Sequence, residues 1–139
     1  MIFLEDDVLQ KLRAGTYETQ VNILPWEEVM TPQYPQLIVK ESPSSRGIWI
    51  DAKPAVVAAK LELIIQAKAS GDSENPVTGR RTARGILNEA DRILTEQMGF
   101  SMEEEAVFSV PEGEPGVCQA RAVYIAQIDK RTNEIVRSV

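Results

Sequence analysis

The residues best suited to chemistry in this chain are carboxylates, and the densest group of them is Glu103, Glu104 and Glu105 in the stretch MEEEAV. Paired carboxylates can bind a divalent metal ion or transfer protons during catalysis. The run starts a predicted strand, where neighbouring side chains point to opposite faces, so only Glu103 and Glu105 can converge on one ion. A solvated strand start explains the run without any ion, and we favour that interpretation.

The other residue types that support catalysis are scarce. The chain contains no histidine, which excludes histidine-based triads, histidine metal ligands and histidine pH switches. Its single cysteine, Cys118, has neither a second thiol for an internal disulfide nor an imidazole to activate it, so we expect a buried apolar side chain. Glycine-rich phosphate loops and calcium-loop spacings are also absent. We therefore predict no catalytic residue, no metal site and no cofactor.

A second charged group consists of Arg80, Arg81 and Arg84, together with Arg46 in an earlier turn-rich segment. These side chains suit three roles: solvating the start of a helix, binding phosphate or DNA, or contacting acidic residues of a neighbouring subunit. Positive charge at the positive end of a helix dipole is unfavourable, which favours an external anionic partner such as the glutamate run of another chain.

The overall charge argues against two kinds of partner. The chain carries a net charge of −6 and has a pI near 4.8, which disfavours binding to nucleic acid because phosphate neutralisation supplies most of that affinity. No apolar run reaches the roughly 20 residues that span a bilayer, and the N-terminal MIFLEDDVLQKL turns acidic at once, unlike a signal peptide. We expect a soluble protein made in the cytoplasm, with no membrane partner.

The stretch that most determines the architecture is residues 54–70, PAVVAAKLELIIQAKAS, whose alanines favour a helix. Its polar side chains all fall at even positions, between apolar odd ones: Lys60, Glu62, Gln66 and Lys68. On a helix these side chains would scatter around the axis, whereas on a strand they share one face. Burying the aliphatic face contributes about 1–3 kcal/mol per side chain and outweighs alanine's preference of tenths of a kcal/mol. We predict one long strand that extends back through Ile48, Trp49 and Ile50. A strand of this length bends, carries a bulge or projects beyond its sheet, and in the third case its end is an arm that another subunit can pair with.

Trp49 and Ile50 lie near the start of that arm, between the turn-rich SPSSRG and a proline. A tryptophan flanked by isoleucines is typical of a core. Other parts of the same chain are, however, least expected to bury side chains at this position. Exposed Trp and Ile at a strand edge are typical of oligomer contacts. Both interpretations stay open, and we take the two residues as candidate interface residues. Trp26, after Pro25, is expected to fill the core at a strand end.

The remaining elements complete one predicted α+β domain over residues 1–139. Its sheet is mostly antiparallel with one long strand, a main amphipathic helix packs on it, and a short N-terminal helix ends at Gly15. Gly99 is placed to stop the main helix in the left-handed conformation. SPSSRG is expected to be a turn, and DKRTNEI a small hairpin or a tail. The other predicted segments are two short strands, a loop, the main helix and a closing hairpin: residues 17–23, 36–41, 69–79, 82–100, 103–110 and 117–128.

This order of elements resembles a known family. From about Leu4 to Ile128, the segments YPQLIVKE, VVAAKLELIIQAKA, ARGILNEADRILTEQM and EEEAVFSVPEGEPGVCQARAVYIAQI are similar to those of tail terminator or tail-completion proteins of long-tailed bacteriophages. The resemblance implies a non-catalytic virion protein, assembled in the host cytoplasm, that forms a ring, usually a hexamer, on the tail tube. Such a ring stops tube polymerisation and joins the tail to the head.

The partners that the resemblance implies are other copies of the chain, the tail tube protein and the head–tail connector protein. It places the contacts in the arm around residues 46–53 and in the loop of residues 71–81. A neck adaptor that docks on the portal is a close alternative. An intracellular binding module that pairs a partner strand on its sheet edge is another, and an enzyme using carboxylates with a divalent ion is the least supported.

Overall fold

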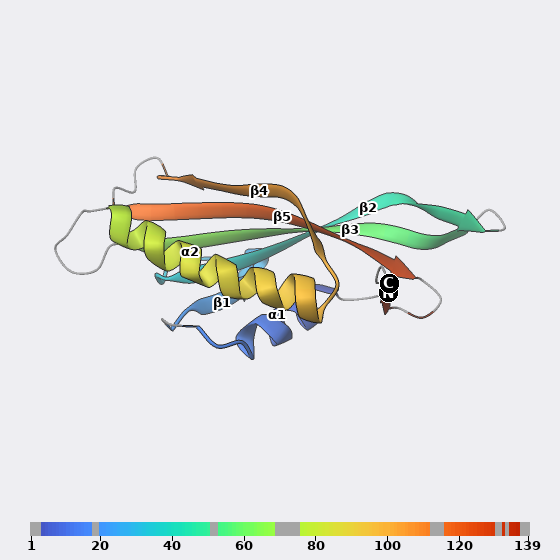
Figure 1. Ribbon diagram of the computed structural model, residues 1–139, viewed down its shortest axis with the longest axis horizontal. Helices are drawn as coiled ribbons and strands as arrows, with labels where there is room; N and C mark the ends of the chain where they lie inside the picture. The colour runs from blue at the N-terminus through green and yellow to red at the C-terminus, as the bar shows by residue number, and fades with distance from the viewer. Residues whose placement is uncertain are drawn as a thin grey trace.

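The computed structural model describes residues 4–17, 20–50, 53–68, 76–111, 116–129, 132 and 134–136. These residues form a curled sheet of six strands with two α-helices, as Figure 1 shows, so the predicted α+β class is confirmed. The helices are α1 (Leu4–Arg13) and α2 (Pro76–Arg92); a 3-10 turn, η1, and a π-helical turn, η2, cover Trp26–Glu28 and Ile93–Gln97. The strands are β1 (Asn22–Pro25), β2 (Gln36–Ile50), β3 (Lys53–Lys68), β4 (Ser101–Ser109), β5 (Val117–Asp129) and β6 (Glu134–Val136).

The strand order across the described sheet is β1-β2-β3-β5-β4. β1 runs parallel to β2, and the other neighbours pair antiparallel. β6 pairs antiparallel with residues 127–129 of β5, beyond the stretch of residues 119–125 that β4 pairs. β1 therefore lies at one edge of the described sheet, and β4 lies at the other, with β6 beside it along β5.

The core lies between α2 and one face of the sheet. Every residue of the predicted apolar helix face is buried: Ala83, Ile86, Leu87, Ala90, Ile93, Leu94 and Met98. The facing side chains come from alternate positions of β3 and β5, as strand geometry requires: Ala59, Leu61, Leu63, Ile65, Ala67, Cys118, Ala120, Ala122, Tyr124, Ala126 and Ile128. The predicted amphipathic main helix is confirmed.

One hydrogen bond ties α2 to the sheet, and a left-handed glycine ends the helical segment after it. The buried Tyr124 hydroxyl donates a hydrogen bond of 2.7 Å to Asp91 Oδ1, and burial together with this carboxylate raises the pKa of the phenol. After η2, Gly99 adopts a φ of 86°, which a residue with a Cβ rarely does, and the Phe100 amide donates to the Leu94 carbonyl at 2.9 Å. The predicted left-handed stop at Gly99 is confirmed.

α1 packs against the same core through Val8, Leu9 and Leu12. The chain leaves α1 through Gly15, where an added Cβ would lie 2.5 Å from Ile93 Cδ1, so a larger residue here would have to displace the end of the Ile93 side chain. Tyr17 then donates a hydrogen bond of 2.8 Å to the Leu12 carbonyl. Burial raises the pKa of Tyr17 to about 12, with a further contribution from the charge of Glu89.

Several predicted boundaries are wrong in the first half of the chain. SPSSRG is part of β2 and not a turn, because β3 supplies hydrogen-bonding partners along it and a register shift between Pro43 and Gly47 accommodates its turn-forming residues. Ile48, Trp49 and Ile50 do not extend β3; they belong to β2, where Ile48 pairs with Val56, so the arm is a hairpin of two strands. β1 begins at Asn22, later than predicted, because the Tyr17 side chain is tied back to α1.

Two further predictions are wrong. α2 begins at Pro76, so Arg80 and Arg81 lie in a helix and not in a loop; proline suits the first helical position because its nitrogen has no hydrogen to leave unpaired. Trp26 is 48% exposed and does not fill the core, and the Lys40 ammonium group lies 5.0 Å from the centroid of its ring. Residues 76–79 of the 71–81 loop implied by the resemblance also belong to α2, and residues 71–75 lie outside the described residues.

Candidate subunit interface

β4 is an edge strand with an exposed surface. It pairs with β5 on one side, and no strand of the described chain pairs with it on the other. Val107 is 64% exposed, and the neighbouring Met102 and Val110 are exposed as well. An edge strand presents a row of N–H and C=O groups that a further strand can pair with, so β4 is competent to extend the sheet to another chain.

The glutamate run lies in the first half of β4. The register between β4 and β5 shifts between Met102 and Glu104, and again between Glu104 and Val107, so the simple alternation used to predict convergence of Glu103 and Glu105 does not apply. Glu103 Oε2 lies 3.3 Å from Lys60 Nζ of β3, an ion pair within the chain. Glu104 and Glu105 are exposed and have no ion-pair partner in the part of the chain that the structure describes.

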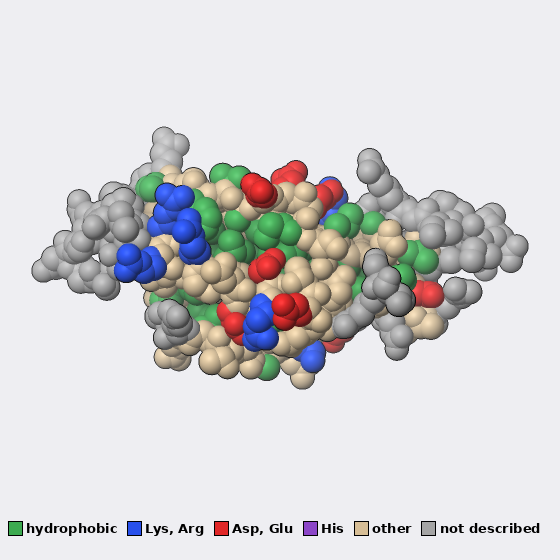
Figure 2. Space-filling model, viewed as in Figure 1, with side chains coloured by type: hydrophobic (Ala, Val, Ile, Leu, Met, Phe, Trp, Pro, Cys, Tyr) green, Lys and Arg blue, Asp and Glu red, His purple; other side chains and the backbone are tan. Residues whose placement is uncertain are grey.

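The arginine cluster lies beside the other half of β4. The guanidinium carbons of Arg80 and Arg84 lie 5.2 and 5.6 Å from the centroid of the Phe108 ring, so α2 and β4 together hold both side chains. Arg81 is exposed next to them. Figure 2 shows Lys and Arg side chains gathered over the N-terminal part of α2, and Asp and Glu side chains over β4.

None of the three arginines has an acidic partner among the described residues. Sequence reasoning proposed the cluster but missed Phe108, which is the residue that brings it to the edge of β4. Cys118 lies close by and is buried as predicted, at 4% exposure. Burial raises the pKa of its thiol, and the charge of Arg80 opposes that rise.

The β2–β3 hairpin provides a second open edge. Residues 36–39 of β2 pair with β1, whereas no described strand pairs with residues 40–50 on that side. The hairpin projects beyond the rest of the sheet in Figure 1, and its pairing continues to Ile50 opposite Lys53. Arg46, Trp49 and Ile50 belong to this part of β2, and their side chains lie outside the described residues.

The β1 edge is closed. α1 packs beside β1, and Arg13 donates two hydrogen bonds to the Ile23 carbonyl, from Nε at 3.1 Å and from a terminal nitrogen at 2.8 Å. That carbonyl is therefore already satisfied. The residues that follow β1 fold over the start of β2 on the face opposite α2, where Trp26 meets Lys40.

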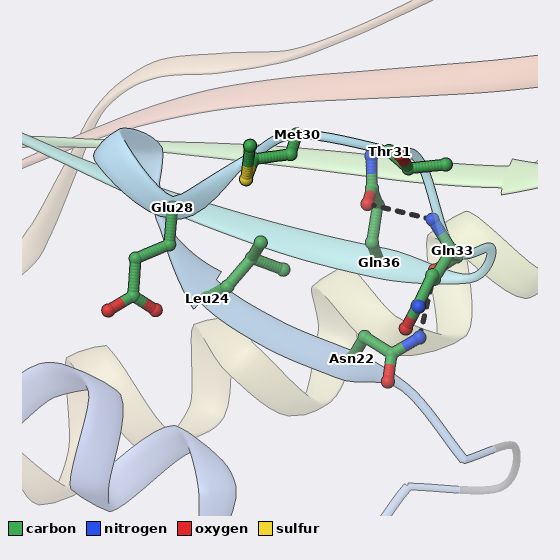
Figure 3. A pocket seen from close by; sticks show the side chains of 7 residues that line it. All are labelled: Asn22, Leu24, Glu28, Met30, Thr31, Gln33 and Gln36. Atoms are coloured by element: carbon green, nitrogen blue, oxygen red, sulfur yellow. Dashed lines mark hydrogen bonds between the residues drawn. The ribbon is translucent and has the colours of Figure 1, made fainter.

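A polar pocket of about 300 Å³ lies under this connection, as Figure 3 shows; it is lined by Asn22, Leu24, Glu28, Met30, Thr31, Gln33 and Gln36. Hydrogen bonds join residues of its lining. Asn22 Nδ2 donates to the backbone carbonyl of Gln33 at 2.9 Å, and the backbone N–H of Gln33 donates to Gln36 Oε1 at 3.3 Å. These bonds hold the connection on β2, and we assign the pocket no ligand.

A row of glutamines crosses the face of the sheet opposite α2. Gln36 donates to Gln66 at 2.6 Å, and Gln66 donates to Gln119 at 2.9 Å, across β2, β3 and β5. The three residues are direct neighbours in register. Sequence reasoning missed this row, because each glutamine alone reads as an ordinary polar position and only the pairing register brings the three together.

Comparisons with known proteins add no relative to this geometry. No protein-family model matches the chain, and no curated protein matches it in sequence. Neither described helix is both long enough and apolar enough to cross a membrane. No group of three metal-binding side chains occurs within the described ranges. The features described above as a candidate interface are the open sheet edges and the charges beside them.

Proposed function

We propose that this chain is a structural phage protein that forms a ring at the end of the tail tube, stops tube polymerisation and joins the tail to the head. The observation that carries the proposal is the pair of open strand edges on opposite sides of one sheet, at β4 and along residues 40–50 of β2. Two different open surfaces on one chain allow head-to-tail contacts, and such contacts close into a ring when the rotation between subunits permits.

The long β2–β3 hairpin is the element that reaches a neighbouring subunit. Its strands have 15 and 16 residues, well above the usual five or six, and the hairpin extends past β1. We assign Arg46, Trp49 and Ile50 to the contact with the neighbour. Tryptophan and arginine are the residue types that most often carry the binding energy of an interface.

The partners of this function are other copies of the chain, the tail tube protein and the head–tail connector protein. The resemblance of the element order to tail terminator proteins supports these assignments and a hexameric ring. We assign the chain binding and no catalysis; the ion pair of Glu103 with Lys60 and the burial of Cys118 support this assignment. A neck adaptor on the portal would use the same edges.

A second candidate is a binding module that pairs an extended partner segment on β4. The exposed edge of β4 favours it, since a free strand edge binds an extended peptide as readily as another subunit. This module would be monomeric alone, which distinguishes it from a ring protein.

The experiment is a measurement of solution mass by light scattering across protein concentration, for the unaltered chain and for Trp49→Ala. We expect a ring-sized species that Trp49→Ala weakens by about 30-fold or more in dissociation constant, as for a tryptophan hot spot, without loss of the circular dichroism spectrum. Met30→Ala is the control, because Met30 is 90% exposed and lies outside the proposed contacts.

A monomer at all concentrations, with and without purified tail tubes, would contradict the ring and support the binding module. Unfolding of the Trp49→Ala variant would place Trp49 in the core and remove it from the interface.

A further inference from the structure

The solvent-facing side of α2 carries three exposed arginines in its first half: Arg80, Arg81 and Arg84. None of them pairs with an acidic side chain that the structure describes. The other arginines whose side chains are described all bond to oxygen atoms of the chain: Arg13, Arg92 and Arg121. Among the described residues, the guanidinium groups open to an external anion are therefore the three on α2, which Figure 2 shows over its N-terminal part.

Phe108 of β4 holds two of these arginines in place. It pairs in register with the buried Ala120 of β5, so its ring lies on the side of the sheet that α2 covers. The guanidinium carbons of Arg80 and Arg84 lie 5.2 and 5.6 Å from the centroid of that ring. A guanidinium held beside an aromatic ring loses less freedom when its planar fork of N–H donors binds a carboxylate. Two anion-binding groups are thus ordered before a ligand arrives.

Gly85 lies on the same side of α2, one helical turn after Arg81, and the fold does not require glycine there. It is exposed, its backbone is helical, and an added Cβ would meet no atom within 4 Å. Glycine is among the least favourable residues in a helix interior, because it loses the most backbone freedom on folding. Packing within the described chain does not explain this cost, whereas the close approach of another backbone does.

The start of α2 favours an external anion as well. Its first turn contains no acidic residue, and Arg80 and Arg81 follow in the next turn. The start of a helix carries a partial positive charge, so cations near it are unfavourable and a carboxylate is favourable. An anion bound here would interact favourably with both the arginines and the helix.

We propose that the outer face of the first half of α2 binds an acidic segment of another protein. Carboxylates of the segment bind Arg80, Arg81 and Arg84, and its backbone lies against the helix at Gly85. A protein segment fits better than nucleic acid, because the cationic surface is small and the net charge of −6 repels a long phosphate backbone. This surface lies on a helix, apart from the open strand edges that we assign to the ring.

The first test is fluorescence anisotropy of a labelled oligoglutamate peptide, titrated with the unaltered chain and with Arg81→Ala combined with Arg84→Ala. We expect the double variant to raise the dissociation constant by about tenfold, because two exposed ion pairs are lost. The matched control is Arg92→Ala combined with Arg121→Ala, which removes the same charge from arginines that already have acidic partners. At about 0.1 M salt, where screening reaches roughly 10 Å, the control should bind as the unaltered chain does.

Gly85→Gln tests the close approach of the partner's backbone. Glutamine favours a helix and its side chain would enter open space, so this variant should unfold at a higher urea concentration than the unaltered chain. The same side chain would hold the partner away from the helix, so the dissociation constant for the peptide should rise about fivefold. A gain in stability together with a loss of binding is not expected of a glycine with a purely structural role.

Unchanged peptide binding by the arginine double variant or by Gly85→Gln, with both folded by circular dichroism, would overturn the proposal. Oligothymidine that binds as tightly as the peptide would also overturn it, because nucleic acid would then be the ligand. None of the α2 variants should change the mass measured by light scattering; a change would place this face in the subunit contact instead. Peptide binding by an unaltered chain that stays monomeric would support this surface and contradict the ring.

Discussion

β1 and β4 form the two edges of the described sheet, and only β1 is covered by other parts of the described chain. β1 has four residues, ends at Pro25, and has its Ile23 carbonyl bonded by Arg13 of α1. β4 has nine residues, pairs with β5 on one side, and has no described strand on its other side. Proteins cover, shorten or charge their edge strands to prevent unwanted pairing. This chain covers and shortens one edge but only charges the other.

The difference indicates where association is tolerated. The register shifts and glutamates in the first half of β4 discourage pairing with an arbitrary strand, because they interrupt the ladder and repel acidic partners. The second half, from Val107, carries apolar and cationic side chains. A partner on β4 is therefore favoured when it brings basic groups to the glutamates of the first half and acidic groups to the arginines beside the second half. Few sequences meet both conditions.

The largest expected contrast between the edges is in stability. Leu12→Ala should lower the free energy of unfolding by about 2–5 kcal/mol, because Leu12 is fully buried where α1 packs beside the β1 edge. Val107→Ala on β4 removes an exposed side chain and should change it by about 0.5 kcal/mol or less. Urea unfolding measures both, at one protein concentration chosen low enough to keep the chain dissociated.

Similar costs for the two substitutions would contradict the comparison. They would mean either that α1 contributes little to the fold or that β4 is covered by part of the chain outside the described residues.

The glutamine row predicts a smaller difference in the free energy of unfolding between two substitutions, one in the middle of the row and one nearer β4. Gln66→Met removes a hydrogen bond on each side and leaves the Gln36 side chain, 1% exposed, without its acceptor, so we expect a cost of about 1–3 kcal/mol. Gln119→Met, one strand nearer β4, should cost less because the Gln66 amide that it leaves unpaired is only partly buried. Urea unfolding of the two variants gives the order of the two costs. A larger cost for Gln119→Met would contradict this order and show that the end of the row nearer β4 contributes more to stability.

The sequence predicts the parts of this fold that depend on local periodicity. The apolar face of α2 and the buried face of β5 repeat regularly over many residues, and Gly99 follows the last buried turn of the helix. In each case one short segment contains the whole signal. The α+β class follows from these elements alone.

The parts that depend on pairing between distant segments were missed. SPSSRG favours turns, and its place in β2 comes from hydrogen bonds to β3 that no local pattern encodes. The stacking of Arg80 on Phe108 joins a helix to a strand more than twenty residues away along the chain. Of the candidate interface, the residue types could therefore be named in advance, but their division into two halves along β4 required the topology.

The smallest predicted effect tests how the β1 edge is closed. Arg13→Ala removes two hydrogen bonds to the Ile23 carbonyl and should lower the free energy of unfolding by about 1 kcal/mol, a modest value because the bonds are exposed to solvent. Lys11→Ala is a matched control, since both residues are cations in the last turn of α1 and interact alike with the helix dipole. The difference between the variants, measured by urea unfolding, isolates the bonds to β1.

The same pair of variants separates two effects of Arg13: preventing β1 from pairing with other chains, and stabilising the fold. If Arg13 keeps β1 from pairing with other chains, Arg13→Ala should also increase the mass measured by light scattering at high concentration, while Lys11→Ala should not. A stability loss without added association would mean that the short length of β1 and its terminal Pro25 are enough to close this edge. In that case length, more than covering, distinguishes it from β4.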